Sequence, residues 1–91
     1  MQRTHAIDGD NKRQKREDFI REGLLDALSL GITRVSWWAI SRRLGIARTQ
    51  MHYYFSGGKM ELMHEIVKLA ESEGYADIVA DAKRNRIGGW K

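Results

Sequence analysis

The sequence predicts an all-α protein, a single small helical domain of about five helices with a helix-turn-helix in its middle. Apolar residues recur three and four positions apart along most of the chain, which is the period of amphipathic helices. Proline is absent, and its absence favours long helices. No segment shows the pattern of a strand. A chain of 91 residues suffices for one hydrophobic core but not for two.

The N-terminal third is predicted to be an arm followed by the first helix. Residues 1–13 are polar and show no hydrophobic period, so we expect a flexible arm. The helix should run from about Gln14 to Leu30 and stop at Gly31, because glycine is typical of helix ends. Its apolar stripe consists of Ile20, Leu24, Ala27 and Leu28.

Two short helices joined by a turn are predicted next. After a link over residues 32–35, the hydroxyl of Ser36 can cap a helix over residues 37–43. The Leu-Gly-Ile sequence of residues 44–46 indicates a tight turn. A third helix is then expected over residues 47–54.

This segment suits a helix-turn-helix, which needs a small residue where its helices cross, a turn glycine and apolar residues facing a supporting helix. Ser41 and Gly45 meet the first two needs. The predicted buried residues are Ile40, Leu44, Ile46, Met51 and Phe55. Burial of the last two turns a polar and aromatic face of the third helix toward solvent. This face consists of Arg48, Thr49, His52 and Tyr53, with Gln50 at its margin.

The outward face of the third helix has the chemistry that reads DNA bases. Arginine can bond bidentately to guanine and glutamine to adenine, while a threonine methyl or a tyrosine ring can meet thymine methyl groups. The alternative is an ordinary solvated helix face.

Two further helices are predicted in the C-terminal part. One runs from Lys59 to about Ser72, and Gly74 should break or bend it. A last amphipathic helix follows, with a stripe of Tyr75, Ile78, Val79 and Ala82. Because the apolar arc of the longer helix is wider than one small core requires, we expect a two-fold dimer built from residues 60–87. The alternative is a last helix that folds back on its own chain. The predicted dimer residues are Leu62, Ile66, Leu69, Tyr75, Ile78 and Val79.

Charge is unevenly distributed along the chain. The formal net charge of +4 indicates little by itself. From Ile32 to Lys59, however, the chain contains no acid, whereas residues 60–83 carry more acids than bases. The basic residues of the acid-free segment are Arg34, Arg42, Arg43, Arg48 and Lys59. Such a segment suits a surface that faces phosphates, with a chance cluster as the alternative.

The chain resembles the DNA-binding domain of the TetR family of transcriptional repressors over roughly Lys15 to Ala70. The resemblance is carried by the segment GITRVSWWAISRRLGIARTQMHYYFSGGKMEL. Its matching features are the helix-ending Gly31, the capping Ser36, the Ile40-Ser41 pair, the Gly45-Ile46 turn, the closing Tyr54-Phe55 pair, and Lys59 and Leu62 at the next helix start. The departures are His52 in place of a tyrosine, Ala47 in place of a hydroxyl cap, and a Gly57-Gly58 loop one residue longer.

The resemblance implies a sequence-specific transcriptional regulator, a repressor, that binds double-stranded DNA. Residues 14–72 would form the DNA-binding domain and read the major groove with the helix over residues 47–54. Residues 73–91 would form a short C-terminal helix and tail used for oligomerisation, and the homodimer would read a palindromic operator. Base contacts are implied for Arg48, Thr49, Gln50 and Tyr53. Phosphate contacts are implied for Ser36, Trp38, His52 and Lys59. The family's long C-terminal half is missing, so we expect no small-molecule effector to act through this chain alone.

Other functions find little support in the residues. The chain has no cysteine and no nucleophile motif, and His5, His52 and His64 lack metal-ligand spacing, so we expect no enzyme, metal or cofactor. Without a recognisable signal peptide or membrane span, we expect a cytoplasmic protein. Trp37 should lie in the core, whereas packing, DNA contact and a protein partner stay open for Trp38. Two alternatives remain: an accessory DNA-binding factor for plasmid or phage replication or partition, and a protein-interaction module that retains the helix-turn-helix shape.

Overall fold

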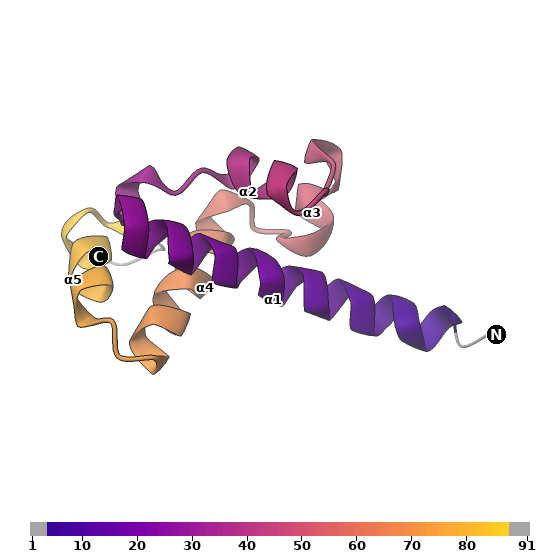
Figure 1. Cartoon of the computed structure of the whole chain (residues 1–91), viewed down its shortest axis with the longest axis horizontal. Helices are drawn as coiled ribbons and strands as arrows, with labels where there is room; N and C mark the ends of the chain where they lie inside the picture. The colour runs from indigo at the N-terminus through magenta and orange to yellow at the C-terminus, as the bar shows by residue number, and fades with distance from the viewer. Residues whose placement is uncertain (1–3, 88–91) are drawn as a thin grey trace.

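A computed structural model of the protein describes residues 4–87, with side chains from residue 11 onward (Figure 1). Over these residues the fold consists of five α-helices and two short 3-10 turns, with no strand. The predicted all-α class with about five helices is therefore confirmed. The α-helices are α1 (Thr4–Leu30), α2 (Trp37–Arg43), α3 (Met51–Tyr54), α4 (Lys59–Ser72) and α5 (Ala76–Arg84).

Helix α1 begins ten residues earlier than the sequence predicts. It starts at Thr4 and continues for 27 residues, so the predicted start at Gln14 is wrong and residues 4–13 are helical. The hydrophobic period could not reveal this part, because the N-terminal end of α1 projects beyond the other helices and has no core to face (Figure 1). Once a helix has formed, each added residue gains one backbone hydrogen bond, so extension of a helix is easier than its nucleation. No proline prevents the extension here.

The buried face of α1 differs from the predicted stripe at its last position. Ile20, Leu24 and Ala27 are buried as expected, together with Phe19, but Leu28 is 43% exposed. Leu28 lies in the last turn of α1, at the rim of the core, where it lines a surface hollow together with Tyr75 and Ile78. The helix ends at Leu30, as predicted.

The first half of the helix-turn-helix follows the sequence prediction closely. Helix α2 spans the predicted residues, and the hydroxyl of Ser36 accepts a hydrogen bond of 3.2 Å from the backbone N–H of Ala39. The following turn closes when the N–H of Ile46 donates to the carbonyl of Ser41 at 2.9 Å. Gly45 has a φ of 69° in this turn, a conformation that strains most residues with a Cβ atom.

The predicted third helix is divided into two parts. Residues Arg48–Gln50 form a 3-10 turn, and only Met51–Tyr54 form the α-helix α3. The N–H of Gln50 donates to the carbonyl of Ala47 at 2.8 Å, and the Gln50 side-chain oxygen accepts the N–H of Ala47 at 3.1 Å. Because Ala47 has no side-chain oxygen to cap a helix, Gln50 closes the first turn instead, and this turn is tighter than an α-helix.

The core lies between α1 and α4, with α5 folded back against α4 and the 3-10 turn Ile32–Arg34. The start of α4 and the break between α4 and α5 around Gly74 agree with the prediction. The apolar arc of α4 is covered within the chain, because α1 is long and packs along it. Its buried members are Leu62, Met63, Ile66, Val67 and Ala70.

Gly23 allows α1 and α4 to approach closely. A Cβ atom added at Gly23 would lie 2.3 Å from Cδ1 and 2.9 Å from Cγ1 of Ile66. We therefore expect Gly23→Val to lower the free energy of unfolding by about 1–3 kcal/mol, the usual effect of overpacking a core. Urea denaturation followed by circular dichroism would measure the loss.

The pairing of Gly23 with Ile66 can be tested by a double-mutant cycle. Ile66→Val removes the Cδ1 atom that the new side chain would meet, so it should recover part of the loss caused by Gly23→Val. Equal effects of Gly23→Val in both backgrounds would contradict the proposed close approach.

Candidate nucleic-acid interface

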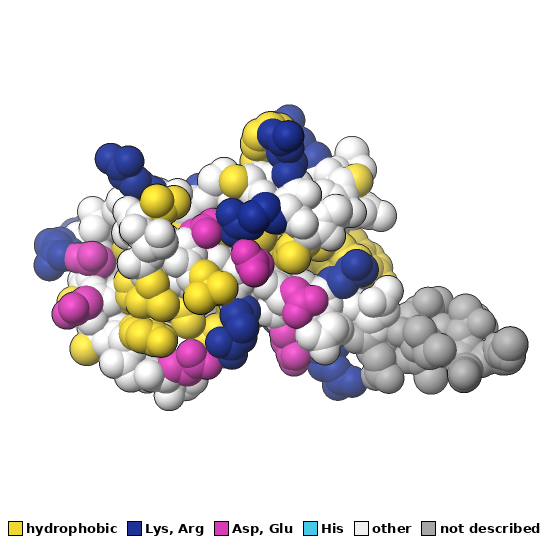
Figure 2. Space-filling model, viewed as in Figure 1, with side chains coloured by type: hydrophobic (Ala, Val, Ile, Leu, Met, Phe, Trp, Pro, Cys, Tyr) yellow, Lys and Arg dark blue, Asp and Glu magenta, His cyan; other side chains and the backbone are white. Residues whose placement is uncertain are grey.

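The face of residues 48–53 is exposed as the sequence predicts. Met51 and Phe55 have no exposed surface, and they hold α3 against the core. All five of the remaining side chains on this face are exposed, namely Arg48, Thr49, Gln50, His52 and Tyr53. In Figure 2, dark blue side chains lie at the top of the molecule, over α2, whose only charged residues are Arg42 and Arg43. Helix α3 contains no Lys, Arg, Asp or Glu.

A surface depression of about 500 Å³ brings the predicted phosphate-contact residues together. It is lined by Ser36, Trp37, Trp38, Arg48, Met51, His52 and Lys59. Four of these residues are the predicted phosphate contacts and a fifth, Arg48, is a predicted base contact. They come from α2 and its cap, the 3-10 turn Arg48–Gln50, α3 and the start of α4. No carboxylate lines the depression, so the cations Arg48 and Lys59 create a positive potential in it.

The two tryptophans differ as the sequence suggests. Trp37 is partly buried and packs against the core, with its ring centre 6.2 Å from that of Phe19 and 6.1 Å from that of Phe55. The centre of the exposed His52 ring lies 5.9 Å from that of Trp37. Trp38 is 48% exposed, and the guanidinium of Arg42 lies 4.7 Å from its ring centre. Trp37 therefore anchors the depression to the core, while Trp38 and Arg42 present an aromatic and cationic rim.

Arg43 is paired with acidic side chains of its own chain, so its charge is already neutralised and is not available for a phosphate. Its guanidinium forms contacts of 3.0 Å with Glu22 and Asp26 of α1. The hydrogen bond that Arg43 donates to the Asp26 carboxylate raises the pKa of Arg43, because it favours the charged guanidinium. Arg43 thus ties α2 to α1, although the sequence groups it with the basic residues of the acid-free segment.

Gln50 has a role that the sequence did not reveal. Its side-chain oxygen accepts the N–H of Ala47, whereas bidentate recognition of adenine uses both the oxygen and the amino group of a glutamine. Pairing of Gln50 with adenine would therefore compete with the closure of the first turn. Arg48, Thr49 and Tyr53 remain the predicted base contacts without such a competing bond.

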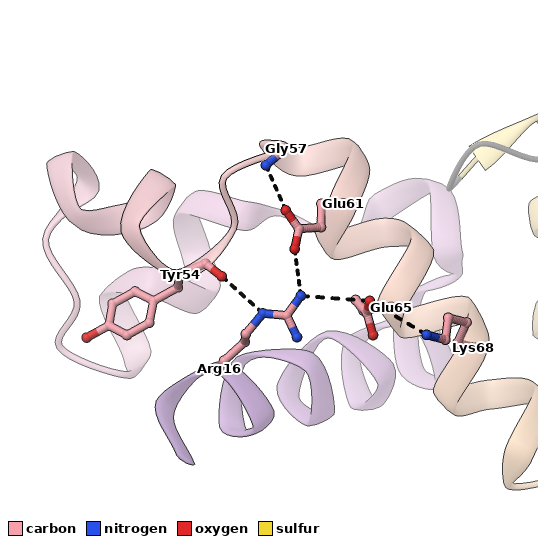
Figure 3. A network of polar contacts seen from close by, with 6 residues as sticks. All are labelled: Arg16, Tyr54, Gly57, Glu61, Glu65 and Lys68. Atoms are coloured by element: carbon pink, nitrogen blue, oxygen red, sulfur yellow. Dashed lines mark hydrogen bonds and ion pairs between the residues drawn. The ribbon is translucent and has the colours of Figure 1, made fainter. Parts of the chain in front are cut away.

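A polar network centred on Arg16 holds the end of α3 and the start of α4 against α1 (Figure 3). The Arg16 Nε donates to the carbonyl of Tyr54 at 3.1 Å, and its Nη2 donates to Glu61 at 2.6 Å. The second oxygen of Glu61 accepts the N–H of Gly57 at 2.7 Å. Glu65 lies 3.7 Å from the same guanidinium. The network fixes the loop that leads from α3 to Lys59.

The same network makes part of the stability dependent on pH. The N–H of Gly57, and next the guanidinium of Arg16, lower the pKa of Glu61 by stabilising its charged form. A lowered pKa in the folded state contributes stability above the ordinary glutamate range, and this contribution is lost as the pH falls through the folded-state pKa. Since the Glu61 side chain is 29% exposed, we expect a contribution below about 1 kcal/mol.

Glu61→Gln tests this pH dependence. The variant should unfold more easily than the wild type at neutral pH, and the difference should shrink in acid, where Glu61 is protonated in both states. Urea midpoints across the acidic range would show it. Glu17→Gln is a suitable control because Glu17 is exposed on α1. A constant difference between Glu61→Gln and the wild type at every pH would contradict the assignment.

The sequence prediction did not identify two residues that lie near the interface, Lys12 and Arg16. The Lys12 ammonium lies 4.4 Å from the centre of the Tyr53 ring, and the Arg16 guanidinium lies 5.0 Å from that of Phe55. Their spacing of four residues places both on one side of α1. This spacing was the available signal, but the prediction of a flexible arm through residue 13 concealed it.

For three residues, the prediction that they lie at a dimer interface is wrong. Leu62 and Ile66 have no exposed surface, and Ile78 is only 7% exposed, because these side chains form the core of their own chain. Leu69 and Val79 are partly buried, and Tyr75 is 39% exposed. The last helix folds back on its own chain, which was the alternative reading of its apolar stripe.

Comparison of the chain with protein-family models, curated proteins and solved structures finds no match. The resemblance to the TetR family therefore remains a prediction from the quoted residues. Among the described residues, no group of three or more His, Asp or Glu side chains could hold a metal ion. No helix in the same part of the chain is long and apolar enough to cross a membrane.

Proposed function

We propose that the protein is a sequence-specific transcriptional regulator, a repressor, that binds the major groove of double-stranded DNA with residues 47–54. The observation that supports this most directly is the acid-free depression. In it, Arg48 lies beside Ser36, Trp38, His52 and Lys59. Donors and cations gathered on one exposed surface are what a DNA backbone requires, and an adjacent arginine can reach a guanine.

The proposed contacts divide into two kinds. Arg48, Thr49 and Tyr53 read base edges from the exposed face of the 3-10 turn and α3. Ser36, Trp38, His52 and Lys59 bind phosphates and set the position of this face in the groove. A regulator of this kind acts in the cytoplasm of a prokaryotic cell, on the DNA that it controls.

Selection of duplexes from random DNA tests the proposed function. Purified protein should enrich a defined sequence, and a reporter gene carrying that sequence should be repressed. If the protein neutralises only two phosphates, its affinity for the duplex should fall about tenfold for a fourfold rise in salt concentration. Binding that lacks both enrichment and salt dependence would contradict the proposal and favour a protein-interaction module. Enrichment without regulation of a reporter would favour an accessory factor in replication or partition.

We further propose that two copies of the chain bind a palindromic operator. Hydrophobic side chains are visible where the end of α1 meets α4 and α5 (Figure 2). Exposed apolar residues of these segments include Leu25, Leu28 and Leu30 at the end of α1 and Tyr75 before α5, and Leu69 and Val79 are partly buried. A two-fold contact of this surface, away from α3, would leave both recognition elements free for half-sites about 34 Å apart.

Sedimentation of the free protein tests the dimer. The wild type should sediment as a dimer, and Leu28→Asp or Tyr75→Asp should produce monomers that keep their helices. Met60→Asp is the matched control, because Met60 is 59% exposed at the start of α4, outside this surface. A wild type that stays monomeric at high concentration and binds its site as one copy would rule out the dimer.

A further inference from the structure

We infer that α1 makes a second, sequence-independent contact with DNA, in which Lys12 binds a backbone phosphate beside the base pair that Tyr53 faces. This inference rests on the proposed DNA-binding function and adds a surface outside the helix-turn-helix. Its basis is the contact of Lys12 and Arg16, on the part of α1 that lies beside α3, with the end of α3.

The contact places a positive charge on the recognition face. The Lys12 ammonium lies 4.4 Å from the centre of the Tyr53 ring, a distance suited to a cation–π interaction. Tyr53 is 58% exposed, and the Tyr54 ring packs edge-on against it with 5.0 Å between the ring centres. Since this partner of Lys12 is a neutral ring, the contact leaves the charge of the ammonium available to a phosphate.

The position of Lys12 is set by the next turn of α1. Arg16, four residues later on the same side of the helix, donates to the carbonyl of Tyr54 at 3.1 Å and to Glu61 at 2.6 Å. These bonds fix both the rotation and the height of α1 relative to α3. Lys12 therefore lies at the end of α3 in a fixed register, as phosphate contacts that orient a protein on DNA require.

The composition of this part of α1 favours a polyanion over a protein partner. Residues 11–16 read Asn-Lys-Arg-Gln-Lys-Arg, with no acid and no apolar side chain. A protein interface needs buried apolar or aromatic anchors, and this segment has none to offer. A phosphate backbone needs only cations and hydrogen-bond donors, which the segment supplies.

The salt dependence of duplex binding tests the inference. Lys12→Gln removes the charge and keeps most of the side-chain length. On the selected duplex it should make the slope of log affinity against log salt shallower by about one unit per protomer. At physiological salt this corresponds to about a fivefold loss of affinity per contact, equal on selected and unrelated duplexes. Lys12→Arg should retain the wild-type slope.

Two matched variants separate failure of the inference from failure of the proposed function. Lys68→Gln changes an exposed lysine that lies 3.8 Å from Glu65 on α4, and it should leave the slope unchanged. Lys59→Gln changes a lysine of the depression. If Lys59→Gln makes the slope shallower and Lys12→Gln does not, the α1 contact is refuted and the function stands. If the wild type shows no salt-dependent binding, both are refuted.

The Tyr53 ring provides a further test of the shared site. Tyr53→Leu removes the aromatic face that holds the ammonium, so the effect of Lys12→Gln should be smaller in that background than in the wild type. Fully additive effects on the affinity for the selected duplex would contradict the idea that Tyr53 positions Lys12.

Discussion

Phe55→Ala is expected to lower the free energy of unfolding by about 3–5 kcal/mol, the usual loss for a large aromatic residue removed from a core. Phe55 has no exposed surface. Its ring centre lies 5.4 Å from that of Phe19 and 6.1 Å from that of Trp37, and the Arg16 guanidinium lies 5.0 Å from it. The residue therefore joins α1, α2 and α3 at one point. Urea denaturation followed by circular dichroism would measure the loss.

The neighbouring Tyr53→Ala is the control for Phe55→Ala. Both changes truncate an aromatic residue at the end of the helix-turn-helix, but Tyr53 is 58% exposed. Tyr53→Ala should therefore lower the free energy of unfolding by less than about 1 kcal/mol. The two variants should thus lose different properties. Phe55→Ala loses stability, whereas Tyr53→Ala keeps its fold and loses DNA affinity. Similar losses of stability in both would contradict the central position of Phe55.

Arg48→Ala is expected to cost about 1–3 kcal/mol of binding free energy on the preferred duplex and to relax selectivity at one base pair. Arg48 is exposed at the edge of the depression, in the first turn of the recognition element. Lys59→Ala should instead weaken binding to all duplexes alike and make the salt slope shallower by about one unit. Titration of labelled duplexes at several salt concentrations would separate the two effects.

Arg34→Ala is the matched control for Arg48→Ala. Arg34 is an exposed arginine of the same acid-free segment, at the end of a 3-10 turn and outside the depression. It should change selectivity little. If Arg48→Ala leaves both affinity and selectivity intact, or if Arg34→Ala matches its effect, the recognition face is assigned to the wrong residues.

The local pattern of the sequence was enough to predict most of the helices. The cap at Ser36 and the glycine at position 45 bound α2 correctly, because caps and positive-φ turns depend on neighbouring residues alone. The spacing of Met51 and Phe55 likewise predicted which face of α3 is exposed. The same reasoning failed for residues 4–13, because a helix without an apolar face leaves no period to read.

Only the tertiary structure decided which partner covers each face. Leu62, Ile66 and Ile78 carry the apolar pattern of an interface, yet they are buried within their own chain by the long α1 and the returning α5. Arg43 has the charge of a phosphate ligand but pairs with the acids of α1. Lys12 reaches Tyr53 only because α1 lies beside the end of α3. Periodicity and charge along the sequence define what a face can bind, whereas the packing of distant segments determines what it meets.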